Sequence, residues 1–127
     1  MLALIADYME GGFLENIIDM FKHDRSLYRM LPGLMSDERG RVRLGTVALV
    51  ESLKEEHPEE IAAAVPSVAA LLKSPDPTIR ADAAYLLGVI GRREALAYLR
   101  EAAGDENDLA RQIIAEAMDE IGGGPEG

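Results

Sequence analysis

The chain has 127 residues, of which 48% are apolar and 28% charged, and a formal net charge of −10. A chain of this length and apolar content can fold as one domain without covalent staples. It contains no cysteine, which excludes disulfides, thiolate zinc sites and cysteine nucleophiles. The acidic balance disfavours nucleic acid and anionic membranes as partners, because both present negative charge that a protein must neutralise.

The first predicted element is an N-terminal helical cap at residues 1–23. Asp7 and Glu10 interrupt its apolar start before it reaches the length of a signal sequence or a membrane span, so we expect neither and predict a cytoplasmic protein. Gly11 and Gly12 separate a short helix from a second one, whose apolar face is formed by Phe13, Leu14, Ile17, Ile18 and Phe21.

A repeated unit of two helices follows, in segments of about 24–53, 59–91 and 94–121. In the second helix of each unit, an arginine follows an apolar residue. Further apolar residues come after this arginine, at the same distances along the chain in all three units. These offsets form one face of a helix with a period of 3.6 residues. The three arginines are Arg43, Arg80 and Arg111.

The repeat predicts an all-α fold, a short right-handed α-solenoid of about three helix pairs within a single domain. One pair cannot bury its own apolar face, whereas stacking on neighbouring pairs does so. Pro58 suits the start of a helix, and Pro32 and Pro66 should kink or shorten theirs. The glycine-rich residues 122–127 are predicted to be a disordered tail.

The segment from Asp76 to Gly91 carries Asp-Pro, an Ile-Arg pair, paired alanines, Leu-Gly and a closing Ile-Gly. In this order it resembles the HEAT-like repeat of the phycobilin-lyase type. The likeness extends over residues 24–121 and departs from the pattern where Val50-Glu51 and Met118-Asp119 replace Leu-Gly. The resemblance implies that each repeat arginine binds an acidic turn of a neighbouring unit; these structural residues are Arg43, Arg80 and Arg111 with Asp37, Asp76 and Asp105.

The resemblance also implies a partner-binding surface on the concave side, formed by the second helix of each pair. The predicted contacts are Arg41, Leu44, Ala48, Thr78, Asp82, Tyr85, Val89, Leu109, Gln112 and Ile113, with Gly45, Ser52, Ala81, Asp108 and Glu116 beside them. Apolar residues on an open face are typical of an interface. The alternative is that neighbouring helices cover Tyr85 and Val89, which would make them ordinary core residues.

The sequence therefore predicts a non-catalytic scaffold or adaptor that binds another protein, with no catalytic residue, no cofactor and no metal. One alternative is a structural module that forms a homodimer through the last helix, where nothing in the sequence follows to cover Ile113. Another is a ligand-binding or lyase-type accessory protein. Two further questions concern the segment 55–60 and the arginines between Arg25 and Arg43.

The first question concerns His57, which lies in the acidic segment 55–60. These residues either bind a metal or form a solvated helix start, and the second reading is favoured because glutamates suit the first turn of a helix. The second concerns the arginines between Arg25 and Arg43. They either bind an anionic group or balance the surrounding acids, and balancing is again favoured.

Overall fold

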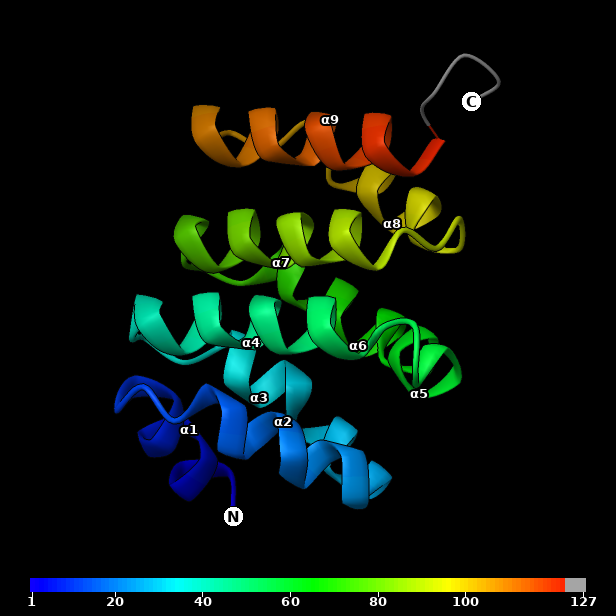
Figure 1. The fold of residues 1–127 in the computed structure, drawn as a ribbon. Helices are drawn as coiled ribbons and strands as arrows, with labels where there is room; N and C mark the ends of the chain where they lie inside the picture. The colour runs from blue at the N-terminus through cyan, green and yellow to red at the C-terminus, as the bar shows by residue number, and fades with distance from the viewer. Residues whose placement is uncertain (123–127) are drawn as a thin grey trace. The chain divides into compact units, whose positions relative to one another are not determined.

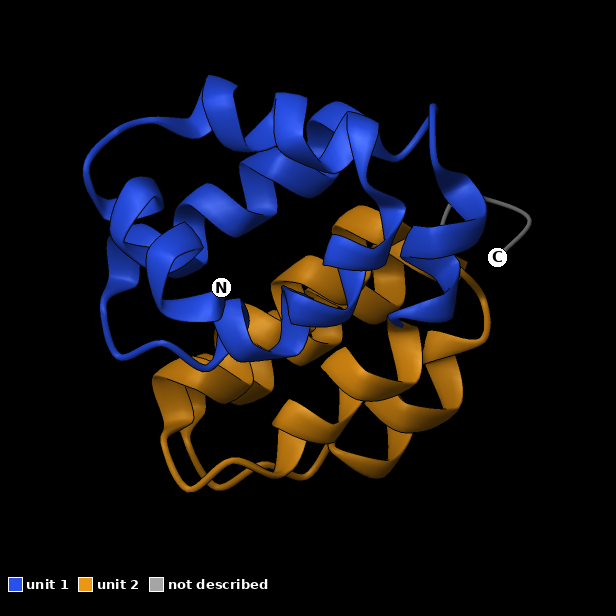
Figure 2. Ribbon diagram, turned by 90° about the horizontal axis from the view of Figure 1, so that it is seen from below, with its two compact units in different colours: residues 1–64 blue, residues 65–127 orange. Residues whose placement is uncertain are grey.

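The computed structural model describes residues 1–122, and within them the chain forms helices and turns without any strand. The predicted all-α class is confirmed. The chain divides into two compact units at residues 64 and 65 (Figure 2). This division falls inside the predicted second repeat, 59–91, so that its first short helix belongs to one unit and its long helix to the other.

The first unit is built around its longest helix, which contacts three of the others (Figure 1). Its buried side chains include Ile17, Phe21 and Leu49, none of which exposes any surface. The elements in chain order are α1 (Leu2–Glu10), α2 (Leu14–His23), the 3-10 helix η1 (Arg25–Met30), α3 (Leu31–Met35), α4 (Gly40–Leu53) and α5 (Pro58–Ala63).

The second unit repeats the arrangement of a long helix beside shorter ones. Its elements are α6 (Val65–Ala69), the 3-10 helix η2 (Ala70–Lys73), α7 (Pro77–Ile90), α8 (Ala95–Glu101) and α9 (Asp108–Gly122). The long helices α7 and α9 lie side by side and run in the same direction, and α6, η2 and α8 pack behind them (Figure 1).

The prolines and one glycine explain where several helices begin and end. Pro58 begins α5 as predicted, and Pro32 and Pro66 lie in helices of only five residues each. Each of the latter two is the second residue of its helix, where a backbone donor is not needed, so the proline separates its helix from the turn before it. Gly91 ends α7 in the left-handed conformation at φ +74°, which glycine adopts without a steric penalty.

Two further predictions concern the C-terminal residues and the absence of a membrane-spanning helix. Gly122, which the sequence placed in the tail, is the last residue of α9, and residues 123–127 lie outside the described part. Within residues 1–122, no helix combines the length and the apolar character needed to cross a membrane.

Candidate functional site

Each repeat arginine makes the same contact with its own turn. Its Nη1 donates to the backbone carbonyl six residues earlier: Arg43 to Asp37 at 2.7 Å, Arg80 to Ser74 at 2.8 Å and Arg111 to Asp105 at 2.9 Å. A charged donor makes a strong hydrogen bond to a carbonyl. These contacts hold the turn before each long helix against the first turn of that helix.

Arg80 also reaches the next turn of its unit, the one that precedes α9. Its Nε lies 2.7 Å from Oδ2 of Asp105 and its Nη2 lies 3.0 Å from Oδ1, a two-point ion pair. The hydrogen bonds from Arg80 lower the pKa of Asp105, and those same bonds raise the pKa of Arg80. Both side chains are largely buried, so the pair joins α7 to the start of α9.

The other two predicted acids have different partners. The carboxylate of Asp37 accepts from Nε and Nη2 of Arg39, each at 2.9 Å, and the hydrogen bonds from Arg39 lower the pKa of Asp37. Asp76 precedes α7 and accepts from the backbone N–H of Thr78 at 2.9 Å, as an N-cap residue does. Of the predicted pairs, Arg80 and Asp105 are brought together by their side chains.

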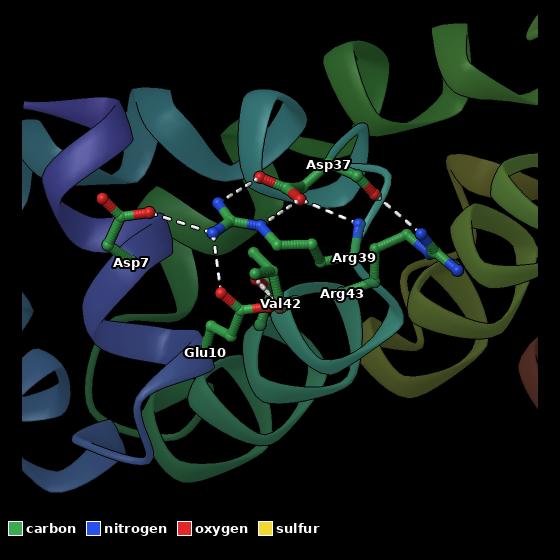
Figure 3. Close-up of polar contacts among 7 residues, drawn as sticks. Asp7, Glu10, Asp37, Arg39, Val42 and Arg43 are labelled. Atoms are coloured by element: carbon green, nitrogen blue, oxygen red, sulfur yellow. Dashed lines mark hydrogen bonds and ion pairs between the residues drawn. The ribbon is translucent and has the colours of Figure 1, made fainter.

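Arg39 forms a network that the sequence reasoning did not single out (Figure 3). Besides its bonds to Asp37, its Nη1 donates to Asp7 at 2.9 Å and to Glu10 at 3.0 Å. The hydrogen bond with Asp37, followed by those with Asp7 and Glu10, raises the pKa of Arg39. The network ties α1 to the turn before α4. Asp7 and Glu10, one helical turn apart on an otherwise apolar segment, were the signal that a cation would be found there.

Several arginines of the 25–43 stretch bind groups of their own unit. Arg25 lies 3.4 Å from Glu60, and Nη1 of Arg41 donates to the carbonyl of Glu10 at 3.3 Å. Arg25 and Arg39 thus lie against acids of their own unit, whereas Arg41 and Arg43 donate to backbone carbonyls.

His57 lies in the core of the first unit. It is only 5% exposed, and its Nδ1 shares a 2.8 Å hydrogen bond with the hydroxyl of Tyr28. Burial, followed by the nearby charge of Glu60, raises the pKa of Tyr28 to about 12. Within residues 1–122, no three histidine, aspartate or glutamate side chains are grouped to hold a metal ion. The histidine is a hydrogen-bonded core residue.

In the second unit, the predicted partner-binding residues differ in exposure. Tyr85 on α7 is 53% exposed and Leu109 on α9 is 60% exposed. Thr78 and Gln112 are also exposed, whereas Asp82, Val89 and Ile113 are half-buried. Ala81, which was expected beside this surface, is buried instead. We use the name α7/α9 face for the surface formed by Thr78, Asp82, Tyr85, Val89, Leu109, Gln112 and Ile113.

A glycine lets the two helices that carry this face approach closely. A side-chain carbon placed on Gly88 would lie 3.3 Å from the Cα of Ala117. This contact sets the register of the parallel helices and places Tyr85 close to the level of Ile114. The α7/α9 face is therefore carried by two helices in direct backbone contact.

In the first unit, the corresponding residues of α4 are partly occupied by α1. Leu44 is 70% exposed and Ala48 is half-buried. A side chain on Gly45 would meet the side chain of Met9, and Arg41, although exposed, is bonded to the end of α1. The predicted surface on α4 thus lies beside a helix of its own unit.

A groove opens on another side of the second unit, between α6 with η2 and α8. Its volume is about 530 Å³, and small residues leave it unfilled. Lys73 and Glu101 lie 3.2 Å apart among its lining residues, which are Pro66, Ala69, Ala70, Leu72, Lys73, Tyr98, Glu101, Ala102, Gly104 and Asp105. The sequence carried no clear signal for this groove, because each of its alanines also fits a packed helix.

The sequence family described as HEAT repeats matches residues 64–126. This range contains all the described helices of the second unit. The match and the all-helical structure agree with the fold class of a short helical solenoid and support a HEAT-like repeat family. No curated protein matches the chain.

Proposed function

On the premise that residues 64–126 are HEAT repeats, which are commonly protein-interaction scaffolds, we propose that the chain is a non-catalytic scaffold. It binds another protein through the α7/α9 face. The cytoplasmic location and the likeness of residues 76–91 to phycobilin-lyase-type repeats belong to this proposal.

The exposure of Tyr85 is the observation that carries the proposal. A tyrosine that is 53% exposed on a helix held against its neighbour presents a large, rigid side chain at little entropic cost. Leu109, also exposed, adds apolar area on the adjacent helix. Rigid aromatic and apolar groups of this kind dominate the binding energy of protein interfaces.

Charge on α9 indicates which partner fits. The exposed acids of this helix are Asp108, Glu116, Asp119 and Glu120. Its one arginine, Arg111, lies 2.6 Å from Asp108 and so is already paired. A partner segment with basic residues beside apolar ones complements this surface.

The same acids argue against a homodimer through the last helix. If α9 packed on α9 of a second copy across a twofold axis, the carboxylates of one copy would lie close to those of the other. Like charges at short range are destabilising, and no unpaired cation of α9 offsets them.

The test is capture of partners from the native organism with Tyr85→Asp and Leu109→Asp, and with Tyr98→Asp as the matched control. Tyr98 is also exposed, but it lines the groove beside α8 rather than the α7/α9 face. We expect both face variants to lose the captured protein while the control keeps it, with unchanged helix content by circular dichroism. Retention of the same protein by both face variants would remove the α7/α9 face from the proposal.

The groove favours a second candidate, a ligand-binding accessory role. Its volume of about 530 Å³ lies within the range of small-molecule pockets, and alanines, a leucine and a tyrosine supply apolar lining. Native mass spectrometry of the purified chain should then show a retained small molecule that is lost in Ala70→Trp. A bare chain in both samples counts against this role.

A further inference from the structure

Large apolar side chains gather on the surface around α1. Five of them are between 41% and 65% exposed, and all lie within the first thirteen residues. Four of them, Met1, Leu4, Tyr8 and Phe13, are called the α1 patch; the fifth, Leu2, lies on the buried side of α1. An apolar patch of this extent is often functional.

The α1 patch is continuous. Leu4 and Tyr8 are four residues apart and therefore share one face of α1. The rings of Tyr8 and Phe13 lie 5.7 Å apart between centroids, which extends the surface past the end of the helix. Leu2 is not part of this surface: it lies three residues before Ile5 and four before Ala6, on the buried side of α1, and its side chain lies against Gly33 of α3.

The opposite side of α1 is already buried. Ile5, Ala6 and Met9 face the core of the first unit and are at most 3% exposed. With one apolar stripe buried and a second exposed, α1 is apolar on two sides. A helix of that composition is typical of a position with packing partners on both sides.

Charge around the α1 patch is nearly balanced, unlike that of the whole chain, because Arg39 and Arg41 lie beside Asp7, Glu10 and Asp37 and leave one negative charge. Asp7 and Glu10 are the acids of α1, and both bind Arg39 (Figure 3). Arg41 is bonded to the backbone at the end of the same helix. On a chain of net charge −10, a second copy meets less repulsion at a nearly neutral surface than at an acidic one.

The exposed area also fits a second copy. Four large side chains, each roughly half exposed, present on the order of 400 Å² of apolar surface. Two such patches facing each other would bury about 800 Å² in total, which is the size of a weak interface. A twofold axis lets the same patch serve both partners.

We infer that the α1 patch is the docking surface for a second copy of this chain, with α1 packed on α1 across a twofold axis. The inference is independent of the α7/α9 face, which lies in the other unit. It places self-association at the beginning of the chain rather than on its last helix.

Sedimentation velocity across a concentration series tests the inference. The wild-type chain should shift from monomer to dimer between about 1 and 100 μM, the range expected for a small interface. Leu4→Glu with Tyr8→Glu should stay monomeric, because each copy then carries two added charges into the contact. Leu109→Glu, which adds a charge to an exposed leucine of α9, should dimerise like the wild type.

A cross-linking experiment keeps the test valid if the double variant loses structure. The chain has no cysteine, so Tyr8→Cys introduces a single thiol. A twofold axis at the α1 patch brings the two thiols together, and mild oxidation should give a disulfide-linked dimer. Leu109→Cys is the matched control and should cross-link far more slowly.

Three results would overturn the inference. The first is a wild-type chain that is monomeric throughout the concentration series. The second is a dimer that persists in the folded Leu4→Glu, Tyr8→Glu variant, and the third is faster cross-linking at position 109 than at position 8.

Discussion

The two long helices α4 and α7 occupy the same place in the repeat, yet their corresponding surfaces differ. On α4, Gly45 lies under Met9 of α1, and Arg41 is bonded to the end of that helix. On α7, the residue that matches Gly45 is Asp82, and the one that matches Ala48 is Tyr85. Small residues admit a covering helix, whereas a large exposed tyrosine stays available to a partner.

The two helices are also held by different means. α7 packs against α9 through the backbone at Gly88 and through the largely buried pair of Arg80 and Asp105. α1 packs on the first unit through Ile5, Ala6 and Met9 and is tied to the turn before α4 by the ion pairs of Arg39, whose acidic partners Asp7 and Glu10 are exposed. Because these ion pairs are more exposed than the pair of Arg80 and Asp105, we expect α1 to be displaced more easily than α9.

The largest effect is expected from Asp105→Asn, which removes the charge that neutralises Arg80. A largely buried guanidinium without its counter-charge destabilises the folded state, and we expect the melting temperature to fall by about 10 °C. The melting temperature is measured by thermal unfolding followed by circular dichroism. Asp108→Asn is the control, because Asp108 is 92% exposed where it pairs with Arg111, and such pairs contribute little.

The same variant has a defined pH dependence. The pKa of Asp105 is lowered from its ordinary 3.8, so its contribution is present above that value and is lost as the pH falls through the lower folded-state pKa. The wild type should therefore lose stability on acidification below about pH 4, and Asp105→Asn should lose less. Equal acid sensitivity in the two proteins would contradict the role given to this pair.

A smaller effect is expected from Gly88→Val. The added carbons meet the backbone of Ala117, which cannot rotate away as a side chain can. We expect a loss of about 1–3 kcal/mol in the free energy of unfolding, measured by urea denaturation. Gly104→Val is the control, because a side-chain carbon there has no heavy atom within 4 Å. Equal stability of the two variants would show that the close approach is not needed.

The smallest global effect is expected from Gly45→Val. The obstruction is the Met9 side chain, which is flexible, and valine has a better helix propensity than glycine, so the unfolding free energy should change by about 1 kcal/mol or less. The local effect should be larger. Amide exchange in α1 should accelerate about tenfold while exchange in α7 and α9 stays the same.

Leu44→Ala is the control for this variant, since Leu44 is an exposed residue of α4. Unchanged exchange in α1 of Gly45→Val would show that α1 is held as firmly as α9. In that case the contrast between the two units would disappear.

Most of the fold could be predicted from the repeat pattern. Apolar residues that recur with a period of 3.6 located the long helices, and Pro58, Asp76 and Gly91 marked where helices begin or end. The broken first helices followed from Pro32 and Pro66. These are local features, and local sequence decides them.

The candidate site was less predictable, because exposure depends on residues distant in the sequence. Tyr85 and Ala81 were both assigned to the partner surface, yet Tyr85 is exposed and Ala81 is buried. His57 was weighed as a metal ligand or a solvated residue, and it is a core residue bonded to Tyr28. The partner of each polar group was decided by packing.

The sequence by itself determined the helical class, the repeat and the positions of its arginines, because the spacing of apolar residues and the turn residues act over a few neighbours. Only the tertiary structure decided that α1 lies on α4 and that Arg39 joins three carboxylates around it. Such contacts join segments about 30 residues apart, and no local rule states which face of a helix another segment will cover.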